Sequence, residues 1–179
     1  MNITIRPGTP ADAEALAELA ARTFHDTFAA DNRPEDLALH LSQAYGPIQQ
    51  GRELADADIS TLLADTGQGL AAYAQLRRGT APDCVEGESP LELWRFYVVR
   101  EWHGRGVAHM LMQHVDAEAE RLGAHPLWLG VWERNERALA FYRKYGFVDV
   151  GSHIFMVGTD AQTDRIMTRR VASSQRLDD

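Results

Sequence analysis

A glycine-rich turn is the feature of the sequence whose residue types are best suited to bind a ligand. It reads HGRGVA over residues 103–108, after an apolar stretch and before an amphipathic one. Glycine lets a backbone approach a ligand closely, and the free N–H groups and positive dipole end of a following helix attract phosphate oxygens. Arg105 adds a charged donor. The turn therefore predicts a pyrophosphate cradle, although two glycines in such a turn are also typical of a tight connection without a ligand.

A second group of residues, mostly acidic, surrounds the junction between the first two predicted helices. These side chains could act as counter-charges for an elongated polycation while one of its amines enters a cleft. A solvated helix end explains them as well, because the helix dipole favours acidic residues near a helix N-terminus. The group consists of His25, Asp26, Asp31, Glu35 and Asp36.

The elements that position these residues follow from the apolar periodicity. The alternating segment Ile3–Arg6 leads into a helix that Thr9 caps, with Pro10 at its first position. From residue 91 onward the order is strand, helix, strand, helix, which is that of a βαβ unit. Segments 59–64 and 70–76 form a predicted hairpin. The expected strands are 3–6, 59–64, 70–76, 91–99, 126–131, 147–157 and 164–171, and the expected helices carry Leu16, Leu37, Leu111 and Leu139.

Composition and charge limit the class of protein. The chain has 179 residues, 45% of them hydrophobic, which is enough for one domain with a full core. Its net charge of −8 argues against non-specific nucleic-acid binding, and no apolar run approaches the roughly 20 residues of a membrane helix. A single cysteine, Cys84, suits a reducing compartment. We expect one domain over residues 1–171, a flexible tail over 172–179 and a cytoplasmic location.

A second motif lies about one strand and a turn after the cradle helix. Residues 135–147 read NERALAFYRKYGF, which matches the pattern NxxAxxFYxxxGF. The succession of strand, HGRGVA, helix, strand and this motif resembles the GNAT superfamily of acetyl-CoA-dependent N-acetyltransferases from Leu91 to Phe147. The family pattern begins with Gln or Arg where this chain has His103, a change we expect a backbone cradle to tolerate. The resemblance implies an α/β fold with a mixed central sheet of six to seven strands, a splayed central strand pair and about four flanking helices.

The resemblance also implies an acetyl-CoA site, residue by residue. Tyr142 matches the position that protonates the departing CoA thiolate, and Asn135 the position that hydrogen-bonds the pantetheine arm. Many relatives carry a base on the strand after the cradle helix, but that position is Gly130 in this chain, so Glu92 on the preceding strand is the expected base. The residues expected to hold acetyl-CoA through their backbone are Phe96, Tyr97 and Val98 on the splayed strand and Gly104, Arg105, Gly106, Val107, Ala108 and His109 at the pyrophosphate.

Structural roles also explain these three side chains. Tyr142 could be an aromatic residue that packs a helix against the sheet, and Asn135 could be a helix N-cap, a role compatible with ligand contact. Glu92 could be a solvated or salt-bridged carboxylate on a strand. The four tryptophans are more typical of packing than of a cation cage, with Trp132 as the expected exception.

A narrower resemblance concerns the acceptor half of the site. Segments LGVWERN (129–135), GSHIF (151–155) and GTDAQTD (158–164) together are similar to the PaiA-type branch, whose members acetylate spermidine and spermine. Segment 23–32 is similar to that branch as well, and it lies where the family builds its acceptor pocket. The resemblance thus implies a polyamine acceptor that contacts Phe24, His25, Asp26 and Trp132.

Direct acetyl transfer requires a deprotonated amine, a polarised thioester carbonyl and a proton for the leaving sulfur. It requires no covalent nucleophile, and the spacing of the histidines predicts no metal site. A protein N-terminus, a lysine or an amino-sugar are alternative acceptors, because the CoA half of the site is shared while the acceptor half varies. A non-catalytic acyl-CoA-binding regulator is the alternative of another class. The resemblance also suggests a homodimer through the last strands, whereas the sequence itself does not determine the oligomeric state.

Overall fold

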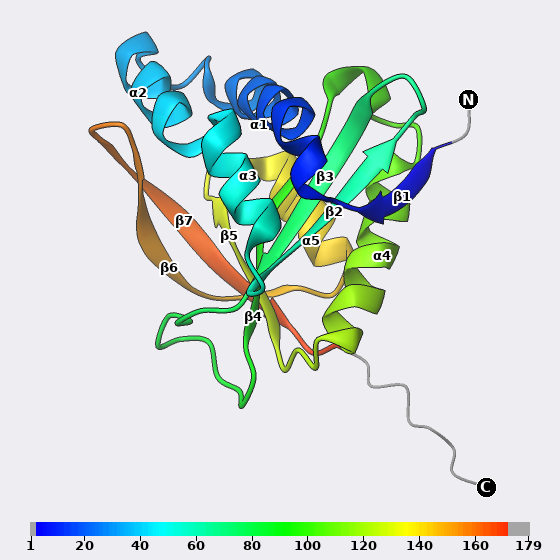
Figure 1. Cartoon of the computed structure of the whole chain (residues 1–179). Helices are drawn as coiled ribbons and strands as arrows, with labels where there is room; N and C mark the ends of the chain where they lie inside the picture. The colour runs from blue at the N-terminus through cyan, green and yellow to red at the C-terminus, as the bar shows by residue number, and fades with distance from the viewer. Residues whose placement is uncertain (1–2, 172–179) are drawn as a thin grey trace, which may run out of the picture.

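A mixed sheet of seven strands forms the centre of the computed structural model, which describes residues 3–171 (Figure 1). The strands are β1 (Thr4–Pro7), β2 (Ile59–Asp65), β3 (Leu70–Arg77), β4 (Leu91–Val98), β5 (Leu127–Trp132), β6 (Val148–Val157) and β7 (Asp160–Arg169). Their spatial order is β1-β2-β3-β4-β5-β7-β6, and only β4 and β5 run parallel to each other. The predicted hairpin of β2 and β3 and the predicted mixed sheet are confirmed.

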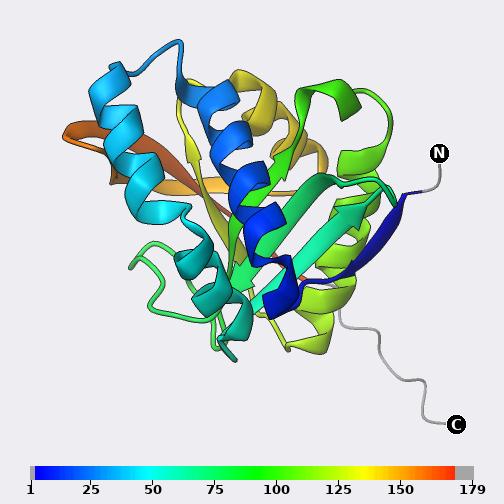
Figure 2. The same ribbon diagram turned by 45° about the horizontal axis from the view of Figure 1, so that its top comes forward.

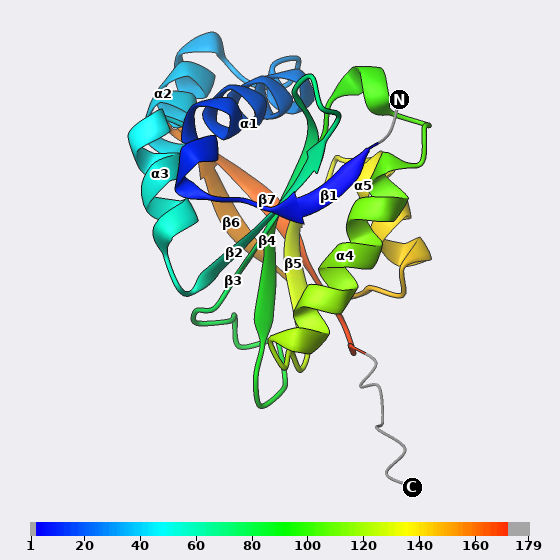
Figure 3. The same ribbon diagram turned by 45° about the vertical axis from the view of Figure 1, so that its right-hand side comes forward.

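Helices cover both faces of the sheet. The helices α1 (Ala13–Phe28), α2 (Pro34–Ala44) and α3 (Pro47–Ala55) lie over one face, and α4 (Val107–Arg121) and α5 (Glu136–Lys144) lie over the other (Figure 1, Figure 3). The helix predicted to start at Pro10 begins as a 3-10 turn, Pro10–Asp12, that Thr9 caps. Two apolar clusters hold these layers together, one centred on α4 and the other on α1.

The helix α3 is the one that the sequence analysis missed, so there are five α-helices where about four were expected. Its inward side chains include Gln50 and Glu53, which are 0% and 4% exposed. Because these buried residues are polar, the helix lacks the apolar stripe that periodicity detects. Gln50 donates to the Ala44 carbonyl at 3.0 Å, and Glu53 pairs with Arg95 on β4.

The ribbon of β6 and β7 begins its pairing earlier than the sequence predicted. Gly158 has a φ of +60°, which permits a tight turn, and β7 therefore starts at Asp160 and not at Asp164. The turn lies beside α2 (Figure 2), where Asp36 accepts a 2.7 Å hydrogen bond from the Thr159 N–H. This contact joins the far end of the ribbon to the helical layer.

The parallel strands β4 and β5 separate soon after they pair. Their register includes only Leu91 with Leu127 and Glu92 with Trp128, whereas β4 stays paired with β3 as far as Val98. The predicted splayed central pair is thereby confirmed. A crevice at the carboxyl ends of parallel strands is a common place for ligands in α/β proteins.

Two remaining expectations concern the ends of the chain and membranes. The tail predicted over residues 172–179 lies outside the described residues. Within residues 3–171, no helix combines the length and the apolar character needed to cross a bilayer.

Candidate active site

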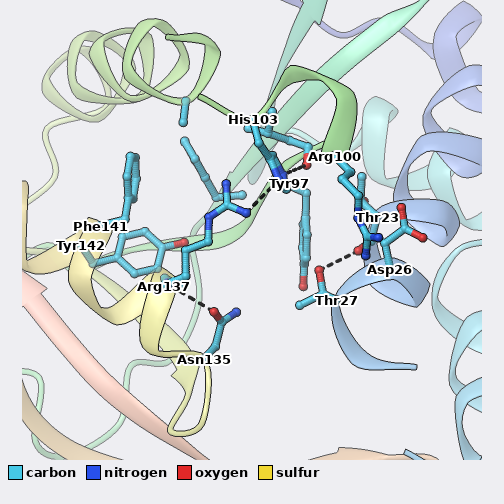
Figure 4. Close-up of a pocket in the computed structure, with 14 residues that line it drawn as sticks. Thr23, Asp26, Thr27, Tyr97, Arg100, His103, Asn135, Arg137, Phe141 and Tyr142 are labelled. Carbon is cyan, nitrogen blue, oxygen red and sulfur yellow. Dashed lines mark hydrogen bonds between the residues drawn. The ribbon is translucent and has the colours of Figure 1, made fainter. Parts of the chain in front are cut away.

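The separation of β4 from β5 opens a cavity of about 290 Å³, called the first cavity below (Figure 4). The carboxyl end of β4 forms its floor, and α1 and α5 form opposite walls. Two guanidinium groups reach it, from Arg100 and Arg137. Its lining consists of Thr23, Asp26, Thr27, Phe96, Tyr97, Val98, Arg100, His103, Ala108, Asn135, Arg137, Ala138, Phe141 and Tyr142.

The glycine-rich turn leads directly from this cavity into α4. Gly104 and Gly106 have φ values of +73° and +82°, and Gly106 is the N-cap residue of α4. A Cβ at either glycine would meet no atom within 4 Å, so the turn needs glycine for its backbone conformation and not for space. The first N–H groups of α4 have no partner within the helix and are available to phosphate oxygens. The turn thus has the backbone geometry of an anion site.

His103 ties this turn to the neighbouring elements. Its Nε2 lies 2.8 Å from the Val98 carbonyl oxygen, and its Nδ1 lies 2.7 Å from Nη1 of Arg137. Because arginine only donates, Nδ1 accepts and Nε2–H donates to the carbonyl, so the imidazole is neutral in this arrangement. His103 therefore positions Arg137 at the first cavity.

Tyr142 stands where the first cavity meets another. Its side chain is 9% exposed, and the rings of Phe96 and Phe147 contact it at centroid distances of 6.4 and 5.6 Å. Figure 4 shows its hydroxyl directed toward the centre of the first cavity. Burial raises the pKa of Tyr142 well above its ordinary value, so the hydroxyl keeps its proton at neutral pH.

A cavity of about 280 Å³, called the second cavity below, lies on the other side of this tyrosine. It shares Thr27, Phe96, Tyr97, Asn135, Ala138 and Tyr142 with the first, so the two spaces meet along the end of β4. Aromatic rings dominate its walls. The further lining residues are Phe24, Phe28, His40, Ala44, Tyr45, Arg77, Glu92, Leu93, Trp94, Arg95, Gly130, Val131, Trp132, His153, Phe155 and Asp164.

Comparison with known proteins identifies the family. Residues 14–147 match the model of the Acetyltransferase (GNAT) family. The chain belongs to this family. It is 34% identical over 160 residues to an N-acetyltransferase of Mycobacterium tuberculosis, covering 89% of this chain and 98% of that one. It is 33% identical over 150 residues to the aminoglycoside N(6')-acetyltransferase type 1 of Stenotrophomonas maltophilia, covering 80% and 85%.

A solved structure agrees with this assignment at the level of the fold. The PaiA N-acetyltransferase of Thermoplasma acidophilum, crystallised with coenzyme A, superposes with a TM-score of 0.74 and 22% identity over 95% of this chain and 99% of that one. The protein is therefore a GNAT N-acetyltransferase, and solved structures that share its fold hold coenzyme A or acetyl-CoA.

The first cavity and its turn fit the coenzyme of this GNAT enzyme. The turn offers N–H donors for a pyrophosphate, and the open edge of β4 offers backbone groups to amides. Asn135 accepts a 3.1 Å hydrogen bond from the Ala138 N–H through Oδ1 while it lines both cavities, so its roles as helix cap and as cavity residue coexist. Val107 is fully buried, and its side chain belongs to the apolar core around α4.

Two of the predicted coenzyme residues lie on the open side of the turn. Arg105 stacks over Trp102, with 5.4 Å between the guanidinium carbon and the ring centroid. His109 is exposed, and its Nδ1 lies 2.5 Å from the Tyr145 hydroxyl. Neither of them lines a cavity, so their predicted contacts are with the phosphate end of the coenzyme.

The structure brings together only part of the predicted acceptor residues. Phe24 and Trp132 both line the second cavity. Asp26 lines the first cavity, and His25 lies outside both, with its side chain 57% exposed and its Nδ1 3.9 Å from Asp26. Asp36 is buried in its contact with Thr159 and is no free counter-charge.

Glu92 was expected either as a base or as a solvated or salt-bridged strand carboxylate, and in the structure it lines a cavity and forms a salt bridge. Its side chain lines the second cavity, and its Oε2 accepts a 2.5 Å hydrogen bond from Nε of Arg77. The Arg77 guanidinium lies over the Trp94 ring, 4.0 Å from its centroid. Glu92 is therefore a salt-bridged carboxylate that lines the second cavity.

Sequence reasoning missed Asp164 and His153, which also line the second cavity. Their side chains approach each other from β7 and β6, with 3.8 Å between Asp164 Oδ2 and His153 Nε2. Burial raises the pKa of Asp164 to about 6. A signal existed, because Asp164 lies two residues from Gln162 and two from Ile166 along β7. Side chains at this spacing share one face of a strand, and both of these neighbours are buried.

The histidine spacing predicted no metal site, and this stays a prediction. Among residues 3–171, no group of three or more His, Cys, Asp or Glu side chains is arranged to hold a metal ion.

Proposed function

We propose that the enzyme transfers the acetyl group of acetyl-CoA directly to a primary amine of a small cationic acceptor, with a polyamine such as spermidine or spermine as the first candidate. The observation that carries this proposal is the junction of the two cavities at Tyr142. A coenzyme in the first cavity and an amine in the second would meet there. Such a meeting point is what direct transfer between two bound substrates requires.

The walls of the second cavity support a cationic acceptor. Aromatic rings attract ammonium groups, and Phe24 and Trp132 contribute rings to this lining. The carboxylates of Glu92 and Asp164 add negative charge to the same space. A polyamine has both the positive charge and the slender shape to use this combination.

The chain's own residues supply proton transfer and positioning. Acetyl-CoA supplies the activated acetyl group, whose bond to sulfur breaks as the bond to the amine nitrogen forms. The Tyr142 hydroxyl, protonated because of its burial, is positioned to donate a proton to the leaving sulfur. Asn135 would hold the pantetheine arm, and the resemblance predicts Glu92 as the acceptor of the amine proton. The bond from Arg77 occupies one oxygen of that carboxylate.

An aminoglycoside or another amino-sugar is the second candidate acceptor. A relative at 33% identity is named an aminoglycoside N(6')-acetyltransferase, and such an acceptor is also polycationic. A protein N-terminus or a lysine side chain would use the same coenzyme half. A non-catalytic acyl-CoA-binding regulator would retain the first cavity and have no use for the Tyr142 hydroxyl.

A thiol-release assay with acetyl-CoA and a panel of amines tests the proposal. The panel contains spermidine, spermine, lysine, an aminoglycoside, an amino-sugar and short peptides. We expect turnover with the polyamines and a loss of about 100-fold or more in kcat for Tyr142→Phe, because a general acid contributes at least about that factor. Tyr73→Phe is the matched control, since this tyrosine is also buried and lines neither cavity.

Other results would point elsewhere. Turnover with the aminoglycoside alone would replace the polyamine by the second candidate. Binding of acetyl-CoA without turnover of any amine would favour the regulator. Equal activity of Tyr142→Phe and wild type would remove the proton-donor assignment, and full activity of Glu92→Gln would remove the predicted base.

A further inference from the structure

The absence of a side chain at Gly130 lets two polar groups reach the second cavity from neighbouring strands. A Cβ built at this glycine would lie 3.3 Å from Oδ2 of Asp164 and 3.3 Å from Nε2 of His153. These two side chains therefore occupy the space that a residue larger than glycine would take on β5. Glycine at position 130 therefore leaves the room in which these two side chains lie.

Strand register places the pair in one row across the sheet. Asp164 on β7 pairs with Trp132 on β5 and with His153 on β6. Side chains at paired positions share a face of the sheet. The carboxylate thus stands between an aromatic wall of the acceptor space and an imidazole, and all three side chains line the second cavity.

The charges around Asp164 differ from those around the other cavity carboxylate. Arg77 pairs with Glu92. Arg165 follows Asp164 in sequence, but its guanidinium pairs with Asp149 on the outer side of the ribbon at 2.8 Å. Among the described residues, the cationic partner recorded for Asp164 is His153 at 3.8 Å, and this imidazole carries charge only when protonated. Glu133 and Tyr97 also interact electrostatically with the carboxylate. The other titratable groups that line the same cavity are His40, Tyr45, Arg77, Glu92, Arg95 and Tyr142.

Burial and solvent access suit this carboxyl to proton transfer. Its side chain is 14% exposed, and the side chain of His153 is 37% exposed. Burial raises the pKa of Asp164 to about 6, protonated His153 opposes that rise and the charge of Glu133 adds to it. A base with a pKa near the working pH is the most effective kind, because it is deprotonated yet still accepts a proton readily.

Resting on the proposed function, we propose that Asp164 is a catalytic residue that binds the acceptor ammonium and removes its proton, and that His153 is its positioning residue. The N–H bond breaks, its electron pair stays on nitrogen as the lone pair that attacks the acetyl carbon, and the proton moves to a carboxylate oxygen of Asp164. The carboxylic acid then returns this proton to solvent before the next turnover. No further reactant is needed.

The pH dependence of Asp164→Asn tests this role with any amine that the wild type acetylates. For the wild type we expect kcat/KM to rise with pH through an acidic limb near pH 6. For Asp164→Asn we expect a loss of about 100-fold or more and no such limb. Asp149→Asn is the matched control, because this carboxylate lies on the same ribbon, pairs with Arg165 and lines neither cavity. Its activity should stay within about twofold of wild type.

Two further variants separate a chemical role from a structural one. In Asp164→Ala, added formate should restore part of the lost activity, and acetyl-CoA binding should match that of wild type. In His153→Gln, the acidic limb should move to higher pH, because protonated His153 lowers the pKa of the carboxyl. A defect in folding alone would produce neither rescue nor a shifted limb.

The outcomes distinguish this inference from the proposed function. If no amine reacts with the wild type, the proposed function fails and the inference fails with it. If an amine reacts and Asp164→Asn keeps both its rate and the acidic limb, only the inference is overturned. Loss of the limb in Glu92→Gln with retention in Asp164→Asn would assign the base to Glu92 instead.

Discussion

Burial has opposite chemical consequences at Tyr142 and Asp164, the two residues proposed to move protons. Removal from water disfavours the charged form of any side chain. For Tyr142 this keeps the phenol protonated and able to donate, and for Asp164 it makes the carboxylate more willing to accept. One physical cause thus prepares an acid and a base on two sides of the same junction.

A stability measurement follows from the raised pKa of Asp164. Because its pKa is about 6 in the folded state against 3.8 as reference, the folded state binds more protons between these values. The contribution of the Asp164 carboxyl to the free energy of unfolding is therefore fully present below pH 4 and is lost as the pH rises through 6. We expect Asp164→Asn to raise the free energy of unfolding at pH 7 by about 3 kcal/mol and to match wild type near pH 3.5, measured by urea unfolding. A less stable variant at pH 7 would contradict burial of the charged carboxylate as the cause of the raised pKa.

At the scale of elements, the start of α4 is the predicted cradle of the coenzyme. Gly106, its N-cap residue, has a left-handed conformation, and the first N–H groups of the helix have no partner within it. His103 fastens the same turn to β4 through the Val98 carbonyl, in a position where the family pattern has Gln or Arg. The cradle therefore depends on backbone conformation more than on any single charged side chain.

Gly106→Ala tests the importance of this conformation. Space for a methyl group exists, but its φ of +82° disfavours an L-residue by about 1–2 kcal/mol, so we expect a modest loss of stability and about 10-fold weaker acetyl-CoA binding. Gly67→Ala is the control, because Gly67 has a φ of +78°, equal room and a place in the β2–β3 turn. Calorimetric binding and thermal unfolding of both variants give the comparison. Equal acetyl-CoA affinity in the two variants would show that the cradle tolerates another turn.

At the scale of the whole molecule, a buried polar network joins the helical layer to the sheet under the acceptor space. Arg95 on β4 lines the second cavity, and its Nη1 lies 2.5 Å from Oε2 of Glu53 on α3 and 2.7 Å from Oε1 of Gln75 on β3. The guanidinium also lies 3.6 Å from the centroid of the Trp94 ring. This network holds α3 against the sheet, and Arg95 is the member of it that lines the second cavity.

Removal of one partner from this network should be costly. Glu53→Ala leaves the Arg95 guanidinium buried without its carboxylate, and we expect a loss of about 3–5 kcal/mol in the free energy of unfolding. The double variant Glu53→Leu with Arg95→Met should lose less, because no unpaired charge stays buried. Urea unfolding measures both. A double variant that is less stable than Glu53→Ala would show that the ion pair itself stabilises the fold.

Features encoded by residues close together in sequence were predictable, and features that depend on distant partners were not. The glycine-rich turn and the capping role of Asn135 belong to the first kind. The splayed end of β4 was implied by the family resemblance. The helix α3 was missed because its buried face is polar and becomes favourable only beside Arg95 and Gln75. His25 was expected at the acceptor site, yet the outward face of α1 holds it in solvent.

The sequence by itself determined the family and the alternation of elements, and it predicted the coenzyme half of the site. These features lie within one contiguous stretch, residues 91–147, whose turns and caps are set by local backbone preferences. Only the tertiary structure decided the second cavity, the proposed acceptor half, because its residues come from α1, α2, α5 and from the strands β3 to β7 and meet through long-range pairing. It also decided the protonation of Asp164, since the pKa of a carboxyl depends on burial and on neighbours that no local pattern specifies.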